Sequence, residues 1–469
     1  MVNVTFTPEA NMATYVDGEE FVFNNGDMAW ITVAAVLVML MAPGVGLLYS
    51  GLLRRKNALS MLFLSFVIFS EAILVWFLMG YSLAFSDTGN AFIGNFKFGG
   101  FVDTDIAPSG KLPVLLFAFY QSMFCGVTSV IMTGGVAERG RILPLMVFVL
   151  CWIIIVYCPV ANWVWNANGW IYSLGDLDFA GGGPVHITSG TAGLAISLAC
   201  GKRRGYGTPK LAYRPHSVSH VILGTAFLWF GWFGFNGGSA LAMNLRAIQA
   251  CVATNVAAAT AGLTWMGMDY FYTRKVSAVS VASGVLAGLV GITPAAGYVG
   301  TPASMAIGFL TAIASNFATG LKVVLKIDDA VDSFALHGIG GFVGSFLTGL
   351  FADARVTSFD GTEIDGGWIN RNWIQLGYQL AASVTIMAYT FVVSLILLYA
   401  INYIPGLHLR VKEDAEVVGV DEAECGEAAY DYCIIRRELE GDVDEHKTAV
   451  SSLQTTHSDK EAAGTAVAH

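Results

Sequence analysis

Charged residues are scarce in this 469-residue chain: Asp, Glu, Lys and Arg make up 13% of it, against about 25% in ordinary soluble domains. Hydrophobic residues make up 55%, and the mean hydropathy is +0.60. Apolar runs of roughly 20 residues, long enough to cross a bilayer, recur along most of the sequence. The shortage of charge therefore excludes a soluble globular protein and predicts an all-α polytopic membrane protein embedded in a lipid bilayer.

Several other features are missing. A basic patch is absent, which argues against nucleic acid as a partner. The seven cysteines do not form a secreted-type disulfide framework, and we interpret them as packing residues. The sequence contains no metal-binding motif and no nucleophile–base set, so we expect no metal, no cofactor and no enzymatic activity. No basic residue precedes the first apolar run, near Met28, so we expect no signal peptide.

The acidic charge is concentrated at the two ends of the chain. Residues 1–27 contain five acids and no bases, and residues 405–469 contain fifteen acids and six bases. Such composition is typical of solvated segments outside a bilayer. We therefore predict an extracellular N-terminal segment (1–27), a transmembrane conducting domain (28–404), a structured cytoplasmic region (405–433) and a flexible cytoplasmic tail (434–469).

Apolar runs define eleven predicted spans, and basic residues orient them. The spans are 28–52, 58–85, 112–136, 142–161, 179–200, 215–240, 245–271, 276–299, 302–325, 330–352 and 373–404. Twenty of the 25 basic residues fall on one side of this arrangement. The other side holds Lys97, Lys111, Arg246, Arg355 and Arg371. Because positive charge favours the cytoplasmic side, we expect the N-terminus outside and the C-terminus in the cytoplasm.

Two histidines lie inside predicted spans, where polar groups are costly and often functional. His186 lies in span five and His337 in span ten, and an aspartate precedes each by eight residues: Asp178 and Asp329. Aspartate is a preferred helix N-cap, and eight residues of helix rise about 12 Å. Entering from opposite faces, both histidines would reach the middle of a roughly 30 Å core. This predicts an inverted five-helix repeat followed by an eleventh helix, with the histidines at its centre. The alternative is that each histidine only hydrogen-bonds a neighbouring helix.

Aromatic residues cluster in three stretches on the predicted outer side. The stretches are 119–124, 162–165 and 230–239. Such residues are commonly interfacial anchors. A tryptophan face beside a hydroxyl would also bind a small cation through the ring quadrupole and one hydrogen bond.

Four motifs together carry a resemblance to a known family. They are the run 178–182, the phrase 231–239, the segment 134–139, and a tail phrase that begins at Leu409-Arg410-Val411 and includes Gly419 and Tyr430. Over about residues 25 to 432 the chain resembles the ammonium transporter, methylammonium permease and Rhesus family. It is most similar to fungal high-affinity permeases, some of which also sense ammonium.

The resemblance implies a homotrimer in the plasma membrane that takes up ammonium and methylammonium. It implies an outer ammonium site of Trp165 and Ser239, a gate of Phe124 and Phe235, pore histidines His186 and His337, a pore wall at Trp232, and a structural, transport-essential Asp178. Because a bare cation in a narrow apolar pore is costly, we expect deprotonation near the gate, with the proton moving along the histidines. An electroneutral ammonia channel and a non-conducting ammonium receptor are the alternatives.

Three further positions attract predictions. Asn3 begins an Asn-Val-Thr sequon, which predicts glycosylation unless the tripeptide is a chance match. Ser451 and Ser452 lie near acidic residues and are candidate sites for a cytoplasmic kinase, the alternative being an unmodified tail. Glu71 lies in the middle of span two, and we interpret it as a buried, hydrogen-bonded structural acid.

Overall fold

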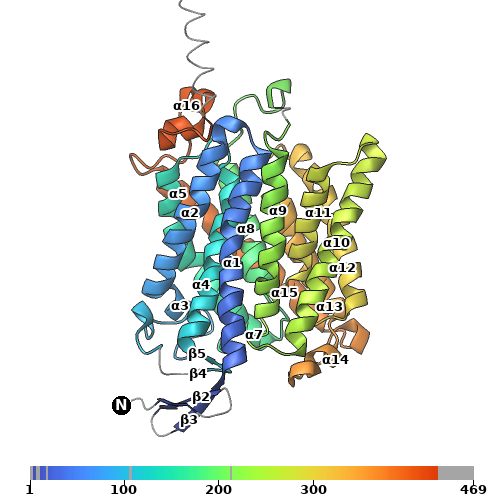
Figure 1. The fold of residues 1–469 in the computed structure, drawn as a ribbon. Helices are drawn as coiled ribbons and strands as arrows, with labels where there is room; N and C mark the ends of the chain where they lie inside the picture. The colour runs from blue at the N-terminus through green and yellow to red at the C-terminus, as the bar shows by residue number, and fades with distance from the viewer. Residues whose placement is uncertain (1–3, 7–10, 17–18, 105–107, 212–213, 431–469) are drawn as a thin grey trace, which may run out of the picture.

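The helices stand side by side in a single bundle (Figure 1). The structure, a computed structural model, describes residues 4–6, 11–16, 19–104, 108–211 and 214–430. The α-helices are α1 Asn25–Leu52, α2 Ala58–Val75, α3 Tyr81–Phe85, α4 Val114–Ile131, α5 Ile142–Trp152, α6 Cys158–Trp165, α7 Trp170–Leu174, α8 Thr188–Cys200, α9 Val218–Trp232, α10 Leu245–Thr273, α11 Ala278–Ile292, α12 Thr301–Val324, α13 Gly340–Phe351, α14 Ala354–Thr357, α15 Gln375–Asn402 and α16 Glu413–Val418.

Short helical segments of other pitch extend or join these helices. Wider π-type turns occur at η2 Trp76–Gly80, η5 Ile153–Tyr157, η6 Gly182–Ile187, η8 Phe233–Gly237, η9 Phe334–Ile339 and η12 Asp421–Cys425. Tighter 3₁₀ turns occur at η1 Arg55–Asn57, η3 Gly99–Phe101, η4 Met132–Val136, η7 Pro209–Leu211, η10 Ser358–Asp360 and η11 Trp368–Asn370. Because π turns inside helices are often found at functional sites, η6, η8 and η9 mark the region where the two histidines lie.

Strands precede and interrupt the helices, which the all-α prediction omitted. Strands β1 Val4–Phe6, β2 Asn11–Val16 and β3 Glu19–Asn24 form an antiparallel sheet. Strands β4 Pro108–Ser109 and β5 Leu112–Pro113 form a second, two-stranded pair. The sheet leads directly into α1, whose start is fixed by Asn24: its side chain accepts hydrogen bonds from the N–H groups of Gly26 and Asp27.

Nine helices in the described part of the chain are long and apolar enough to cross a membrane. They are Asn25–Leu52, Arg55–Phe85, Val114–Val136, Ile142–Leu174, Val218–Gly237, Leu245–Thr273, Thr301–Val324, Phe334–Phe351 and Gln375–Asn402. Predicted spans five and eight coincide instead with shorter or less apolar pieces, η6 with α8 and the 15-residue α11. A multi-pass helical membrane protein is therefore confirmed, whereas the count of eleven stays a prediction.

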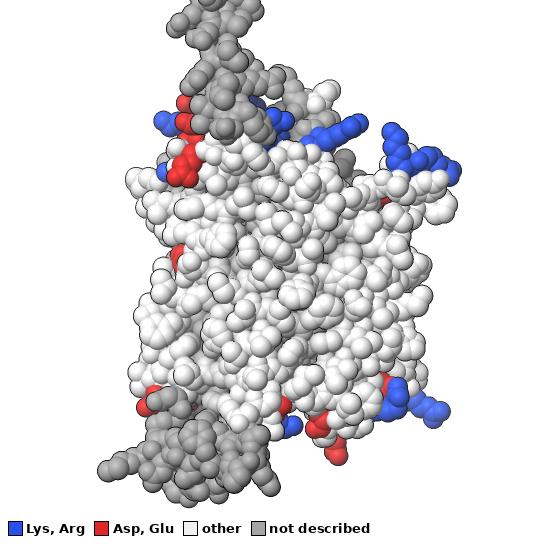
Figure 2. All heavy atoms as spheres, in the orientation of Figure 1, with Lys and Arg blue, Asp and Glu red and all other residues white. Residues whose placement is uncertain are grey.

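The two ends of the bundle carry the charge. Figure 2 shows Lys, Arg, Asp and Glu gathered at both ends of this face, with an almost uncharged belt between them. The N-terminal strands lie at one end and α16 at the opposite end (Figure 1). This separation fits the odd number of crossings that the basic residues indicate.

The segment after α15 packs back onto the bundle through ordered contacts. The N–H of Val411 donates to the carbonyl of Arg139 over 3.0 Å. The carboxylate of Asp421 accepts the N–H groups of Leu59 and Ser60 at the start of α2, over 2.9 and 2.7 Å. Tyr430, the last described residue before the tail, also makes such a contact: its hydroxyl lies 3.2 Å from the Nε2 of His216. The predicted modification sites Asn3, Ser451 and Ser452 lie outside the described residues.

Candidate functional site

The structure brings the two predicted histidines into contact in the interior of the bundle. The Nδ1 atoms of His186 and His337 lie 3.3 Å apart, and both side chains are buried. A neutral imidazole has one N–H donor and one bare acceptor nitrogen, so this contact needs one ring to donate and the other to accept. The buried Nε2 of His186 has no hydrogen-bond partner among the described residues. The pair therefore holds one internal hydrogen bond and offers a free ring nitrogen.

Each histidine is positioned by the aspartate eight residues before it. In the first histidine segment (178–190), the carboxylate of Asp178 accepts the N–H groups of Gly181, Gly182 and Gly183, over 2.7 to 2.8 Å. In the second histidine segment (329–341), Asp329 accepts the N–H of Phe334 over 3.0 Å. Since the first N–H groups of a helix have no partner within the helix, these carboxylates fix where η6 and η9 begin.

A glycine four residues after each histidine lets the two segments cross closely. A Cβ atom on Gly190 would lie 2.2 Å from the backbone nitrogen of Gly338, beside His337. A Cβ atom on Gly341 would lie 2.8 Å from the carbonyl oxygen of Gly182 and 3.1 Å from the Cβ of His186. Each segment thus packs its glycine against the other segment near that segment's histidine. The contact is reciprocal, as a two-fold repeat requires.

A column of aromatic rings covers one side of the histidine pair. His186 stacks on Trp232, with ring centres 5.3 Å apart, and on Phe235, with centres 5.8 Å apart. Phe235 packs against Phe124 at 4.3 Å. The ring of Trp165 stands perpendicular to Phe124 at 6.1 Å. The predicted site residues that carry rings therefore form one continuous chain of ring contacts, which ends at His337.

The hydroxyl of Ser239 lies beside the backbone of Phe235, one of the residues of this column. Its Oγ donates to the carbonyl of Phe235 over 2.8 Å and lies 3.4 Å from the Tyr120 hydroxyl. The indole N–H of Trp165 donates to the carbonyl of Asp178 over 3.3 Å. Trp165 and Ser239 are thus linked through the two phenylalanines, and the capped start of η6 holds the Trp165 ring in place.

Two positioning residues were missed by sequence reasoning. Thr293 accepts the indole N–H of Trp232 over 2.9 Å, across 61 residues of sequence. Tyr120 donates to the backbone carbonyls of Gly234 and Phe235 over 3.0 Å. Tyr120 belongs to an aromatic stretch that the sequence did single out, so its signal was present. Thr293 gave no signal, because a threonine in an apolar helix is common.

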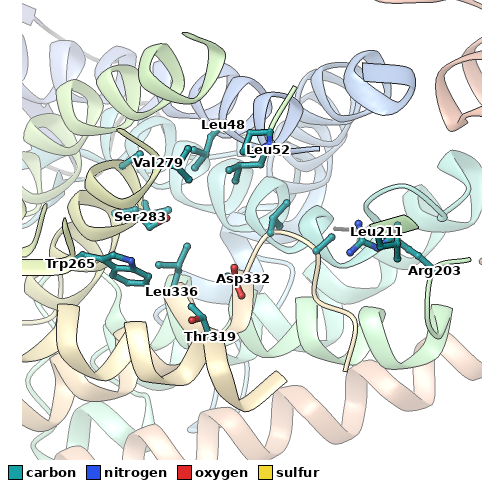
Figure 3. A pocket seen from close by; sticks show the side chains of 15 residues that line it. Leu48, Leu52, Arg203, Leu211, Trp265, Val279, Ser283, Thr319, Asp332 and Leu336 are labelled. Carbon is teal, nitrogen blue, oxygen red and sulfur yellow. The ribbon is translucent and has the colours of Figure 1, made fainter. Parts of the chain in front are cut away.

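A cavity of about 260 Å³ is lined by Leu48 and Leu52 near the end of α1, and so lies toward the end of the bundle that carries α16. Leu336, the neighbour of His337 in the chain, lines it together with Thr319, Ser283, Trp265 and Asp332 (Figure 3). The chain between α8 and α9 contributes lining residues as well. The cavity, called the chamber below, thus borders the second histidine segment and has both polar and apolar lining residues.

An ion-pair network closes the structure around this chamber. Arg203 pairs with Asp328 at 2.7 Å and with Glu138 at 2.8 Å, and Arg54 pairs with Glu138 at 2.7 Å. Burial alone would raise the pKa of Glu138, but the hydrogen bonds and positive charges of Arg54 and Arg203 lower this pKa to about 2. The carboxylate therefore stays ionised at neutral pH.

The interpretation of Glu71 as a hydrogen-bonded structural acid is wrong for one carboxylate oxygen. Its buried Oε2 has no hydrogen-bond partner among the described residues. Span two packs its apolar face on neighbouring helices, and the sequence gives no sign of which polar group would reach this position. Glu71 lies outside the chain of ring contacts and has no assigned role here.

Comparison with known proteins identifies the family and the fold. Residues 29–430 match the model of the Ammonium Transporter Family. Ammonium transporter 1 of Schizosaccharomyces pombe is 50% identical over 415 residues, covering 87% of this chain and 83% of that protein. Ammonium transporter MEP2 of Saccharomyces cerevisiae is 50% identical over 421 residues, covering 87% and 84%.

Solved structures agree with the sequence relatives. The crystal structure of Candida albicans Mep2 superposes with a TM-score of 0.80 at 52% identity, covering 84% of this chain and 87% of that one. A structure described as a sensor Amt protein superposes with a TM-score of 0.79 at 30% identity, covering 85% and 98%. The chain therefore belongs to the ammonium transporter family, whose members are membrane transporters rather than enzymes.

Proposed function

We propose that this protein takes up ammonium and methylammonium across the plasma membrane, by recruiting the cation outside and passing it, deprotonated, along the histidine pair. The contact between the Nδ1 atoms of His186 and His337, 3.3 Å apart in a buried site, supports this proposal most directly. Two histidines in contact can relay a proton while binding a small polar molecule. The aromatic column supplies an entrance and the chamber an exit.

The outer steps rest on the chemistry of the column. Trp165 and Ser239 bind the cation, by the ring quadrupole and by one hydrogen bond. The Phe124–Phe235 pair, with ring centres 4.3 Å apart, closes the path below this position. A charged ion would lose its hydration at this closure, so the proton leaves there and ammonia passes Trp232. Asp178 holds the start of η6 and does not touch the ion.

The same proposal covers topology and assembly. The chain crosses the membrane eleven times, as an inverted five-helix repeat plus one helix, with the N-terminus outside and the C-terminus in the cytoplasm. The reciprocal glycine contacts, and the placement of the N-terminal strands and α16 at opposite ends of the bundle, support this arrangement. The protein forms a homotrimer, and a cytoplasmic kinase acts on its tail.

A dual role as transporter and ammonium sensor is the second candidate. The 30% identical structure described as a sensor Amt protein favours it. Conduction and sensing share the outer site, so a transport measurement alone does not separate them. A sensor that also transports would keep its signal in a variant whose pore histidines are removed.

The test is a paired measurement of current and labelled methylammonium uptake in reconstituted vesicles. The wild type is compared with the double variant H186A/H337A and with His408→Ala, a control histidine on the segment after α15. We expect saturable current in the wild type and the control, and none in the double variant. Uptake without current would replace the proposal by an electroneutral ammonia channel. A folded wild type without uptake would replace it by a non-conducting receptor.

A further inference from the structure

The chamber is lined by an aspartate, Asp332, that forms an ion pair with a lysine of the same chain, Lys322. The Asp332 carboxylate lines the 260 Å³ cavity, and its Oδ1 lies 2.5 Å from the Nζ of Lys322 (Figure 3 labels Asp332). Lys322 Nζ also donates to the carbonyl of Asp329 over 2.9 Å. Both side chains of the ion pair are about 30% exposed, at 31% and 29%. The pair is therefore neither sealed in the interior nor fully hydrated.

The backbone holds Asp332 in an uncommon conformation. Its φ is +57°, in the left-handed region that residues other than glycine rarely adopt. Such conformations are strained and persist where the surroundings enforce them, often at functional positions. Asp332 stands five residues before His337 in the chain, just before η9 begins at Phe334. The carboxylate therefore lies on the segment that carries His337, where it lines the chamber.

The other two acids of this segment already have partners that orient them. Asp328 is paired with Arg203 at 2.7 Å. Asp329 accepts the N–H of Phe334 and the hydroxyl of Ser333. Asp332 differs from both because its side chain lines the cavity, and its partner Lys322 lies near the end of α12.

The chemistry of that partner matters. The lysine Nζ is an alkylammonium group. It has the same unit charge as protonated ammonia or methylamine, and it donates through the same kind of N–H bond. Lys322 and a permeant cation therefore compete for the same carboxylate. With Lys322 in place, the carboxylate is neutralised and holds a second cation weakly. Without Lys322, the carboxylate loses its ion-pair partner. Arg203, the other cation of the chamber wall, is already paired with Asp328 and Glu138, so the carboxylate attracts a permeant cation more strongly.

We propose that Lys322 is a built-in competitor of the permeant cation at Asp332, and so sets the affinity of the inner end of the pathway for ammonium. This inference rests on the proposed transport function. Low inner affinity lets ammonium leave once it has been reprotonated in the chamber, and keeps cytoplasmic ammonium from blocking the exit. The structural alternative is that the ion pair only fastens the end of α12 to the segment before η9.

The test measures inhibition from the inner side, which a purely structural role would not change selectively. Vesicles with one orientation are loaded with increasing ammonium, and initial uptake of labelled methylammonium from outside is recorded. Every variant is measured at the same gradients, so the change in driving force is common to all. In Lys322→Met and Lys322→Gln, we expect the inner ammonium concentration that halves uptake to fall about tenfold. The outer half-saturation concentration should change less than twofold.

Three matched variants show whether a change in inhibition comes from the Lys322–Asp332 ion pair or from a general loss of positive charge. Lys322→Arg keeps a cation against Asp332 and should restore the wild-type value. Lys326→Met removes an exposed lysine four residues away and should leave inhibition unchanged. In Asp332→Asn the inhibiting concentration should rise, and adding Lys322→Met to it should have no further effect.

Unchanged inner inhibition in both charge-free Lys322 variants, with wild-type uptake intact, would overturn this inference alone. An equal shift in Lys326→Met would overturn it too, because the effect would then come from the local field. Wild-type vesicles without uptake would overturn the proposed function, and this inference with it.

Discussion

The two histidine segments share a layout but are held by different kinds of contact. Asp178 binds three successive backbone N–H groups, all within 2.8 Å. Asp329 binds one backbone N–H at 3.0 Å and one hydroxyl, and a lysine holds its own carbonyl. The first segment is thus fixed by main-chain geometry, and the second by side chains that can exchange partners. A segment held by main-chain groups therefore faces a segment held largely by side chains across one pair of rings.

The largest expected effect comes from neutralising the two aspartates. Asp178→Asn loses the charge and turns an NH₂ group toward one backbone N–H. The loss of this bond and the weakening of the other two, together about 3 kcal/mol, amount to roughly 100-fold. We expect methylammonium uptake per surface molecule to fall by about this factor. Asp329→Asn should cost about tenfold, since it affects one backbone bond. Equal losses in uptake assays corrected for surface amount would contradict the contrast between the segments.

The glycine contacts give the next largest difference. Gly190→Ala places a methyl group 2.2 Å from a backbone nitrogen, which no side-chain movement relieves. Overpacking of this kind costs about 1–3 kcal/mol. We expect Gly190→Ala to reduce uptake about tenfold or more, and Gly341→Ala to reduce it less. Gly267→Ala, where nothing lies within 4 Å, is the control and should match the wild type. Thermal unfolding in detergent should follow the same order.

The outer site predicts a change in apparent affinity. Trp165→Leu removes the ring face that we propose for the cation, worth about 1–2 kcal/mol. The outer half-saturation concentration should rise about tenfold, and inner inhibition should stay unchanged. Ser239→Ala removes one hydrogen bond and should raise the half-saturation concentration about threefold. A Trp165→Leu variant that changes only maximal rate would show that this ring gates passage instead of binding the ion.

The smallest effect concerns the ion-pair network, which borders the second segment through Asp328. The pKa of Glu138 is about 2 in the folded protein and 4.5 for an ordinary glutamate. A lowered acid pKa stabilises the fold above pH 4.5, and this contribution is lost as the pH falls toward 2. At pH 3.5 the loss amounts to about 1.4 kcal/mol relative to pH 6. Melting temperatures in detergent should therefore drop between these pH values.

A matched variant isolates this contribution. Glu138→Gln should melt below the wild type at pH 6 and should show a smaller drop at pH 3.5. Because Glu138 does not touch the histidines, uptake at pH 7 should change less than twofold once corrected for surface amount. A wild-type pH dependence that persists in full in Glu138→Gln would assign it to other carboxylates.

Local patterns in the sequence predicted much of the fold and the histidine pair. Long apolar runs are read directly as helices, because a bilayer requires them. The equal spacing of Asp178–His186 and Asp329–His337 is visible because it is a short-range regularity, and helix geometry turns it into equal depth. Predicted span five, 179–200, closely matches a glycine-rich π turn and the helix after it, whereas predicted span eight, 276–299, extends beyond the end of α11 at Ile292.

The contacts that the sequence did not predict join residues of different helices or segments, and no local pattern in the sequence indicates them. Lys322 counted only as a topological charge, since nothing nearby indicates that it bends back to Asp332. The Thr293–Trp232 bond spans 61 residues, and a single sequence does not record such a pairing. The missing partner of Glu71 Oε2 is likewise a property of packed neighbours. The way the helices pack against one another determines these contacts, and a local sequence pattern does not reveal that packing.

The aspartate at position 421 gives α2 a beginning that its own neighbourhood does not supply. Asn57, at the N-cap of α2, makes no capping bond with its side chain, so Leu59 and Ser60 depend on a carboxylate more than 360 residues later. Synthesis proceeds at about 5–20 residues per second, so α2 waits roughly 20 to 70 seconds for this partner. α2 is one of the first helices to be synthesised, yet the hydrogen bonds at its start form only after the chain has been translated as far as Asp421.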